Sequence, residues 1–293
     1  MRWLALLLFA ALLSGAPARA VQVTDDAGHV LTLARPAQRI VSLAPHLTEL
    51  LFAAGAGAPV VGVGAYSDYP PAAKSIPRVG DSAMLDLERI VALKPDLLVV
   101  WRDGNAPQQL QRLATLGIPV YASQLGQLAD IAATLRRLGE LAGTAPAAEA
   151  HARSFEQALQ DLRERYAGRR ELRVFYQIWH RPLLTINGRH LISESLRLCG
   201  ARNVFADLIP LTPTVSEEAV LAQDPDAIVT GSLDPRGPDN LDLWRNLKTL
   251  RATRQNALLT ANPDTLHRSS DRIVDGVREL CEKLESVRVR TGP

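Results

Sequence analysis

Short apolar runs without polar alternation recur along this chain, and they restrict its fold more than any other feature. They lie at 40–43, 60–63, 97–101, 118–121, 174–178, 227–230 and 257–260. A run of this kind is typical of a parallel strand that helices cover on both faces. Helical patterns lie between the runs, at 48–54, 85–93, 106–116 and 191–198, and each ends near a Gly or Pro. The sequence therefore predicts an α/β fold with mainly parallel sheets.

One long helical pattern interrupts this alternation. From Pro146 to Tyr166 the apolar positions recur at helical spacing, and no strand precedes Gly168. At 1.5 Å per residue the helix would be about 30 Å long, the diameter of a small domain. Such a helix either packs inside one domain or joins two lobes as a rigid spine, and we favour the spine. We therefore expect an N-terminal lobe at 21–145, a linking helix at 146–168 and a C-terminal lobe at 169–293.

The two halves share a short pattern. Glu88 precedes Pro95-Asp96 by the same spacing with which Glu218 precedes Pro225-Asp226, and each Pro-Asp pair opens an apolar run. Both copies are typical of a helix that proline ends and that leads directly into a buried strand. The match indicates a structural repeat. Two similar lobes that face each other create a cleft, which is the usual place for a small ligand.

The N-terminus has the features of a secretory signal. Arg2 precedes an apolar stretch from Trp3 to Leu13, and small residues follow up to Ala20. The stretch is much shorter than the roughly 20 residues that cross a bilayer. We expect residues 1–20 to be a cleaved signal peptide and the mature protein to be soluble and periplasmic.

The cysteines and charges restrict the remaining classes. In an exported chain, Cys199 and Cys281 favour a disulfide over two buried free thiols, and without clustered histidines they predict no metal site. Removal of Arg2 and Arg19 would leave 31 basic against 31 acidic residues. This balance, with 5% aromatic residues, predicts neither nucleic acid nor an anionic membrane surface as a partner.

Chemical motifs are scarce, which weakens the case for an enzyme. The chain has no glycine-rich phosphate loop, no Gly-x-Ser-x-Gly elbow and no His-Glu-x-x-His motif. His46 follows Pro45 between a predicted strand and helix, where open α/β sheets commonly place binding residues. His180, beside Trp179, has the equivalent position in the second half.

Aromatic residues follow several of the predicted strands. Trp101 and Trp179 end apolar runs, and Tyr66 and Tyr69 follow the run at 60–63. Such residues either cover the edge of a sheet or form a stacking surface. We favour a surface for a planar or bulky apolar ligand.

Four stretches resemble a known family. They are Arg39-Ile-Val-Ser-Leu-Ala-Pro-His-Leu-Thr-Glu49, Tyr66-Ser-Asp-Tyr-Pro-Pro71, Leu87-Glu-Arg-Ile-Val-Ala-Leu-Lys-Pro-Asp-Leu97 and Trp101-Arg102. Together they resemble the periplasmic receptors for iron-siderophores, haem and cobalamin, and the cobalamin branch in particular. The resemblance implies two α/β lobes joined by one long helix. It also implies a non-enzymatic, monomeric receptor that delivers cobalamin or a related corrinoid to an ABC importer permease and its ATPase, with cobalamin as cargo rather than cofactor.

The resemblance also implies roles for individual residues. Glu88 and Glu218 match the glutamates that dock onto permease arginines, and Cys199 and Cys281 match a disulfide within the second lobe. The expected ligand-binding residues are Pro45, His46, Tyr66, Trp101, Trp179, His180, Thr212 and Arg268.

This chain departs from the cobalamin branch at several of these places. Ser82 and Thr212 replace large aromatic residues, the loop 261–268 lacks one, and Trp179 is expected to restore part of the stacking surface. The loss of large contacts weakens binding or changes the ligand. The alternatives are a receptor for haem or an iron-siderophore, with His46 or His180 as axial ligand, and a periplasmic hydrolase with a histidine in the cleft.

Overall fold

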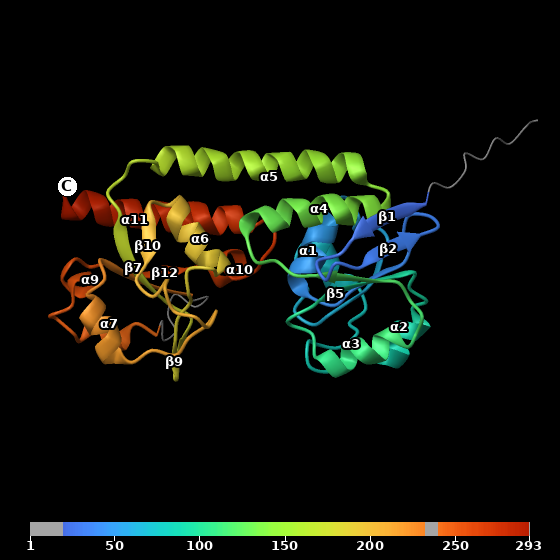
Figure 1. Cartoon of the computed structure of the whole chain (residues 1–293), viewed down its shortest axis with the longest axis horizontal. Helices are drawn as coiled ribbons and strands as arrows, with labels where there is room; N and C mark the ends of the chain where they lie inside the picture. Colours follow the sequence, from blue (N-terminus) through green and yellow to red (C-terminus); the bar gives the residue numbers. More distant parts are fainter. Residues whose placement is uncertain (1–19, 232–239, 293) are drawn as a thin grey trace, which may run out of the picture.

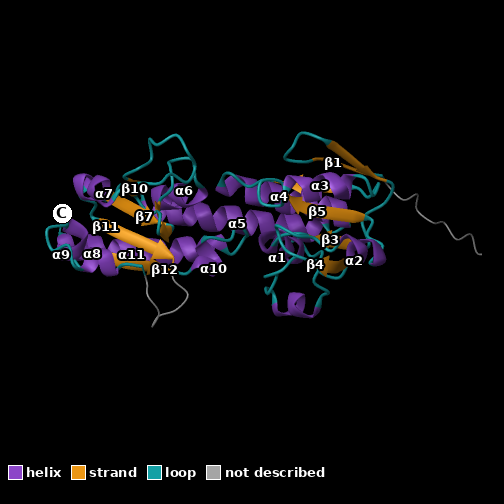
Figure 2. Cartoon of the chain, turned by 90° about the horizontal axis from the view of Figure 1, so that it is seen from below, coloured by secondary structure: helices purple, strands orange, loops and turns teal. Residues whose placement is uncertain are grey.

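Two four-stranded parallel sheets form the centres of two lobes. The computed structural model describes residues 20–231 and 240–292. The first sheet has the strand order β4-β3-β5-β6, and the second has the order β10-β7-β11-β12. All neighbours in both sheets are parallel. Figures 1 and 2 show the two sheets at separate places along the long axis. The predicted α/β class with mainly parallel sheets is confirmed.

The strands of the first sheet are β3 (Ile40–Ser42), β4 (Val60–Val63), β5 (Leu97–Trp101) and β6 (Val120–Ser123). Its helices are α1 (Pro45–Ala53), α2 (Leu87–Ala92), α3 (Pro107–Ala114) and α4 (Leu128–Ala142), and a short 3₁₀ helix spans Pro71–Ser75. Ile40, Leu97 and Val99 point into a core shared with α1 and α4. Val41 and Leu98 point into a second core, shared with α2 and α3. Both faces of the sheet are covered, which explains why its strands lack polar alternation.

The strands of the second sheet are β7 (Leu172–Gln177), β10 (Ala201–Asn203), β11 (Ala227–Gly231) and β12 (Leu258–Ala261). Its helices are α6 (Leu191–Leu198), α7 (Glu217–Gln223), α8 (Asp242–Arg245), α9 (Arg251–Arg254), α10 (Pro263–Leu266) and α11 (Ile273–Thr291). Val174 and Val229 pack with α6 and α11, whereas Phe175 and Ile228 pack against Trp244 of α8. This sheet is therefore covered in the same way.

Several elements were not predicted from the sequence. Among them are the antiparallel hairpins β1 (Val21–Thr24) with β2 (Val30–Leu33) and β8 (Trp179–His180) with β9 (Leu183–Leu184), the edge strand β10, and α4. β10 contains Arg202 and Asn203, so it forms no apolar run. The hairpin strands are short and mostly exposed, so they also lack a strong pattern.

A single long helix connects the lobes. α5 (Ala145–Tyr166) begins after the last helix of the first lobe and leads into β7, and Figure 1 shows it along the top of both lobes. Its apolar stripe packs on α4 and α11. One continuous core joins all three helices, with Leu135, Phe155 and Leu284 as members. The helix therefore has apolar support along its length.

The repeated Pro-Asp pattern has the same structural role in both lobes. The Asp96 carboxylate accepts a 2.8 Å hydrogen bond from the backbone N–H of Arg39, and the Asp226 carboxylate accepts one of 2.8 Å from that of Arg173. Each aspartate also donates its own N–H to the carbonyl of the same arginine. Both aspartates thus fix the start of the strand beside them, and the repeat is structural.

The predicted disulfide is present. Cys199, at the end of α6, is bonded to Cys281 in α11, and both are buried. The predicted signal peptide falls almost wholly on residues 1–19, which lie outside the described residues. Across 20–231 and 240–292, no helix combines the length and apolar character needed to cross a membrane.

Candidate functional site

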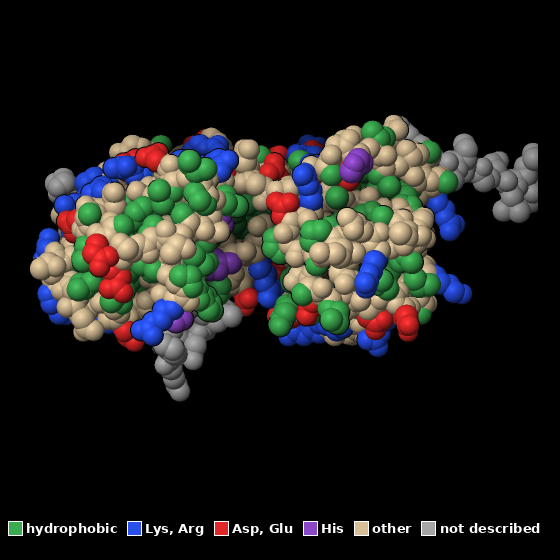
Figure 3. Space-filling view, turned by 60° about the horizontal axis from the view of Figure 1, so that its bottom comes forward, with side chains coloured by type: hydrophobic (Ala, Val, Ile, Leu, Met, Phe, Trp, Pro, Cys, Tyr) green, Lys and Arg blue, Asp and Glu red, His purple; other side chains and the backbone are tan. Residues whose placement is uncertain are grey.

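A cavity lies between the lobes. Figure 3 shows the surface hollowed at this boundary. The cavity has a volume of about 240 Å³ and is lined by Pro45, His46, Tyr66, Trp101, Leu125, His267, Arg268 and Ser269. Its walls are the segments that follow β3, β4, β5 and β6 in one lobe and β12 in the other. The carboxyl ends of parallel strands therefore build the site, as in other open α/β sheets.

His46 and Trp101 form the core of the first wall. Their rings make an edge-to-face contact, with centroids 5.2 Å apart at 89°. His46 is 8% exposed, and burial lowers its pKa to about 4. The imidazole is therefore neutral at neutral pH, and this wall carries no charge from His46.

Two neighbouring residues fix the position of Trp101. The Asn105 side chain accepts a 2.8 Å hydrogen bond from the backbone N–H of Trp101 and donates one of 3.2 Å to the carbonyl of Leu43. Gly104 lies against the indole, because a β-carbon there would be 1.9 Å from Trp101 Cε3. Only glycine permits this close approach, so the local sequence holds the ring at the cavity.

Tyr66 is the most exposed aromatic residue of the site. Its side chain is 78% exposed, and its backbone has a φ of 63°, in the left-handed region. A non-glycine residue in this region is uncommon and often marks a functional site. The exposed ring offers a surface on which a ligand can stack.

The second wall contains His267 and Arg268. His267 Nε2 lies 2.7 Å from the hydroxyl of Tyr176, a buried residue on β7. Burial raises the pKa of that hydroxyl, which therefore keeps its proton and can donate it to the imidazole. A β-carbon at Gly231 would lie 2.5 Å from His267 Cε1, so this histidine too is held by a close backbone approach.

Glu49 of α1 joins the two walls. This carboxylate is 2% exposed and accepts hydrogen bonds from Arg268 Nη1 at 3.0 Å, the Ser270 hydroxyl at 2.5 Å and Arg272 Nη1 at 3.3 Å. All three donors belong to the second lobe. An acidic residue of one lobe is thus buried among donors of the other, directly beside the cavity.

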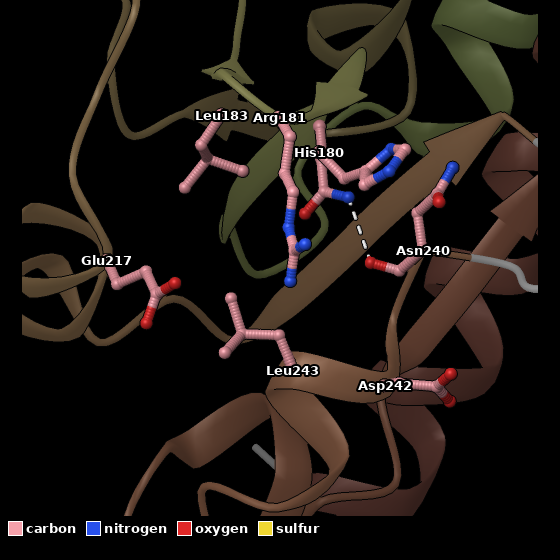
Figure 4. Close-up of a pocket in the computed structure, with 8 residues that line it drawn as sticks. His180, Arg181, Leu183, Glu217, Asn240, Asp242 and Leu243 are labelled. Atoms are coloured by element: carbon pink, nitrogen blue, oxygen red, sulfur yellow. Dashed lines mark hydrogen bonds between the residues drawn. The ribbon is translucent and has the colours of Figure 1, made fainter.

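The predicted binding residues divide into two groups. Pro45, His46, Tyr66, Trp101 and Arg268 lie around one cavity. His180 lines a separate cavity of about 390 Å³ in the second lobe, together with Arg181, Leu183, Glu217, Asn240, Asp242, Leu243 and Gln177. Figure 4 shows the Arg181 side chain extending toward Leu243.

Neither Trp179 nor Thr212 is among the described residues that line the cavity between the lobes. Trp179 is 52% exposed on the β8–β9 hairpin, and its indole N–H donates to the carbonyl of Arg181. Thr212 lies on an exposed loop. These two residues therefore do not share this cavity with His46 and Trp101.

Sequence reasoning missed several residues of the site. Leu125, His267 and Ser269 line the cavity, and Glu49 and Ser270 hold its two walls together. Their positions after β6 and β12 and at the start of α1 were the available signals. Those signals were weak because the cavity takes its lining from both lobes, and the Glu49–Ser270 contact joins residues far apart in the sequence.

Glu88 and Glu218 occupy equivalent places. Each is exposed in the first turn of a short helix, α2 or α7, whose N-terminus is capped by Asp86 or Ser216. A backbone N–H and the Ser216 hydroxyl lower the pKa of Glu218. Figure 1 shows α2 and α7 at the bottom of different lobes, on the side away from α5. Each lobe thus has, on the side away from α5, a short helix with an exposed glutamate in its first turn.

The chain matches a family of known proteins. A family model described as "Periplasmic binding protein" matches residues 40–265, which is more than half of the chain. The vitamin B12-binding protein of Vibrio cholerae is 39% identical over 251 residues, covering 85% of this chain and 90% of that protein. The vitamin B12-binding protein of Vibrio parahaemolyticus is 35% identical over 259 residues, covering 88% and 94%.

Solved structures of periplasmic binding proteins also match this chain. The crystal structure of the periplasmic vitamin B12 binding protein BtuF of Vibrio cholerae matches with a TM-score of 0.79 at 38% identity, covering 86% of this chain and 98% of that one. The periplasmic haem-binding protein BhuT, solved with two haems, matches with a TM-score of 0.75 at 21% identity, covering 85% and 98%. At that lower identity the likeness shows the fold alone.

Proposed function

Because the chain belongs to the periplasmic binding protein family, we propose that it captures cobalamin or a related corrinoid between its lobes and delivers it to an ABC importer. Members of this family bind a substrate and are not enzymes, so the hydrolase alternative is not retained. Relatives that are 35–39% identical are vitamin B12-binding proteins, and they support the choice of ligand.

The observation that carries this proposal is the composition of the cavity. The first wall consists of the neutral, buried imidazole of His46, the Trp101 indole and the exposed Tyr66 ring. A flat ligand can bind there by contact with these uncharged rings. A large, mainly apolar macrocycle with polar side groups suits aromatic surfaces rimmed by a few polar groups. A corrinoid has this shape.

Haem is the second candidate, because the imidazoles of His46 and His267 both line the cavity. An imidazole is a common axial ligand of haem iron. His46 is packed edge-on against Trp101, and His267 Nε2 is occupied by Tyr176, so neither is presented as an open ligand. This arrangement favours the corrinoid.

A binding titration tests the proposal. Purified chain lacking residues 1–20 is titrated with cyanocobalamin and, separately, with haemin, and both are followed by calorimetry and by absorbance. We expect saturable one-to-one binding of cyanocobalamin at micromolar concentration or below. Haemin binding with a Soret band, together with no cyanocobalamin binding, would favour the second candidate instead.

The remaining parts of the proposal concern export and assembly. We propose that residues 1–20 are a cleaved signal peptide, that 21–145 and 169–293 act as lobes about the helix 146–168, and that the mature protein is a soluble periplasmic monomer. We also propose that the partner is the permease of an ABC importer, with its ATPase, and that Glu88 and Glu218 register the two lobes on it. N-terminal sequencing of the exported product tests cleavage after residue 20. Sedimentation velocity tests whether the mature protein is a monomer.

A further inference from the structure

The arginine that lines the cavity is already paired with carboxylates of the protein itself. Arg268, which lines the cavity, contacts three carboxylates: Glu49 at 3.0 Å, Asp68 at 2.6 Å and Asp264 at 3.2 Å. Glu49 lies on α1 and Asp68 follows β4, so two of these carboxylates come from the opposite lobe. The Arg268 side chain is 19% exposed, which leaves it little contact with water.

The second arginine at this place is paired in the same way. Arg272 Nη1 lies 3.3 Å from Glu49 Oε1, and its guanidinium stacks 3.8 Å from the centre of the Tyr69 ring. Two guanidinium groups thus face three carboxylates around the cavity, and Lys74 adds a weaker attraction on Asp68. The Arg268 guanidinium holds the pKa of the Asp68 carboxyl below its usual value, so Asp68 is charged at neutral pH.

We propose that this pairing makes the cleft select ligands with uncharged amide side groups over ligands with several carboxylates, and that Asp68 and Asp264 determine this specificity. The inference rests on the proposed function, because it concerns which tetrapyrrole-like ligand the same cavity accepts.

The chemistry of the two side groups explains the selection. Asp68 and Asp264 already contact the Arg268 guanidinium, so they repel a ligand carboxylate that approaches it and compete with that carboxylate for its N–H groups. An amide avoids both costs, because its carbonyl accepts from a remaining N–H of the guanidinium and its own N–H donates to a carboxylate oxygen. Burial beside Glu49 strengthens these interactions relative to water.

Two corrin ligands of matched shape test the selection. In cobinamide the corrin side chains end in amides, whereas in cobyrinic acid they end in carboxylates, and both are used in their dicyano forms. We expect the wild-type protein to bind cobyrinic acid about tenfold more weakly than cobinamide, or worse, at low ionic strength.

Substitution of the carboxylates gives the decisive comparison. Asp68→Asn and Asp264→Asn remove one negative charge each from side chains that are 51% and 41% exposed, so folding is retained. Each variant is expected to reduce the ratio of cobinamide affinity to cobyrinic acid affinity several-fold, and the double variant is expected to reduce it about tenfold. A ratio of affinities is used because a general disturbance of the cleft affects both ligands alike.

Asp275→Asn is the matched control. Asp275 also pairs with an arginine, Arg278 at 2.6 Å, but this arginine, unlike Arg268, does not line the cavity. It should leave the ratio unchanged. Equal binding of the two corrins by the wild type, or a ratio that Asp68→Asn and Asp264→Asn leave unchanged, overturns the inference and leaves the proposed function standing. Failure of every corrinoid to bind overturns both.

Discussion

The Ser270 hydroxyl in the second lobe donates a 2.5 Å hydrogen bond to Oε2 of Glu49 in the first lobe. Both side chains are buried, at 0% and 2% exposure. Ser270 follows Arg268 and Ser269, which line the cavity, so the contact ties the two walls of the candidate site together. A buried carboxylate that depends on donors from the other lobe makes the interface sensitive to its loss.

Replacement of Glu49 tests this dependence. Glu49→Ala leaves Arg268 and Arg272 without their shared buried partner, and removal of one member of a buried ion pair costs about 3–5 kcal/mol. We expect a loss of this size in the free energy of unfolding, measured by urea denaturation. Ser270→Ala removes only a hydroxyl and should cost about 1–2 kcal/mol. Equal, small effects of both changes would mean that the carboxylate does not hold the lobes together.

Gly104 is expected to control the ligand contact of Trp101. In Gly104→Ala the new methyl group would lie 1.9 Å from the indole, so the ring must move. We expect cyanocobalamin affinity to fall about tenfold, ~1.4 kcal/mol, in a tryptophan fluorescence titration. Gly126→Ala is the control, since its β-carbon would meet only Asp130 Oδ2 at 3.7 Å. Unchanged affinity in Gly104→Ala would show that the position of Trp101 is irrelevant to binding.

The disulfide is expected to contribute stability without affecting binding. Cys199 and Cys281 are 82 positions apart, and a loop of this length contributes about 4.5 kcal/mol in the chain-entropy model. The double variant Cys199→Ala/Cys281→Ala should lose stability of this order in urea. Its ligand affinity should be retained, because neither residue lines the cavity. A large loss of affinity in the folded variant would contradict this separation.

Acid is expected to destabilise the protein through His46. Burial lowers its pKa from 6.5 to about 4, so between these values the unfolded chain binds more protons at this residue than the folded chain does. Stability attributable to His46 is therefore complete above pH 6.5 and is lost as the pH falls toward 4. The expected loss between pH 7 and pH 5 is about 2 kcal/mol.

His46→Gln should flatten this decline, measured as the free energy of unfolding in urea at several pH values. His190, whose pKa burial also lowers to about 4, adds a decline of the same sign that remains in the variant. An unaltered pH dependence in His46→Gln would show that this imidazole is not buried in the folded state.

Charge reversal at Glu88 and Glu218 tests the docking proposal. Because both carboxylates are exposed, Glu88→Lys/Glu218→Lys should leave folding and cyanocobalamin affinity unchanged. Like charges against permease arginines should reduce uptake by cells tenfold or more. Glu282→Lys, an exposed change on α11, is the control and should not reduce uptake. Normal uptake by the double variant would exclude these two residues as docking points.

Local patterns were sufficient to predict much of the fold. β4 and β5 have the predicted bounds, and α6 matches its predicted range, because their apolar runs and flanking Gly or Pro residues act over a few positions. The repeated Pro-Asp pattern has the same structural role in both lobes, since each aspartate accepts a hydrogen bond from the backbone at the start of the neighbouring strand. β10 and the two hairpins escaped prediction because edge strands need no continuous apolar run.

The sequence by itself determined two covered parallel sheets, a long helix between them, a disulfide and several of the aromatic residues of the cleft. Only the tertiary structure decided that Glu49 accepts hydrogen bonds from Arg268, Ser270 and Arg272, and that His267 rather than His180 shares a cavity with His46. The burial of each strand and helix against its neighbours determines which residue types it contains and at what spacing, so the sequence alone reveals it. The charge balance of the cleft depends on which side chains of one lobe meet those of the other, across about 220 positions of chain, and no local pattern encodes that meeting.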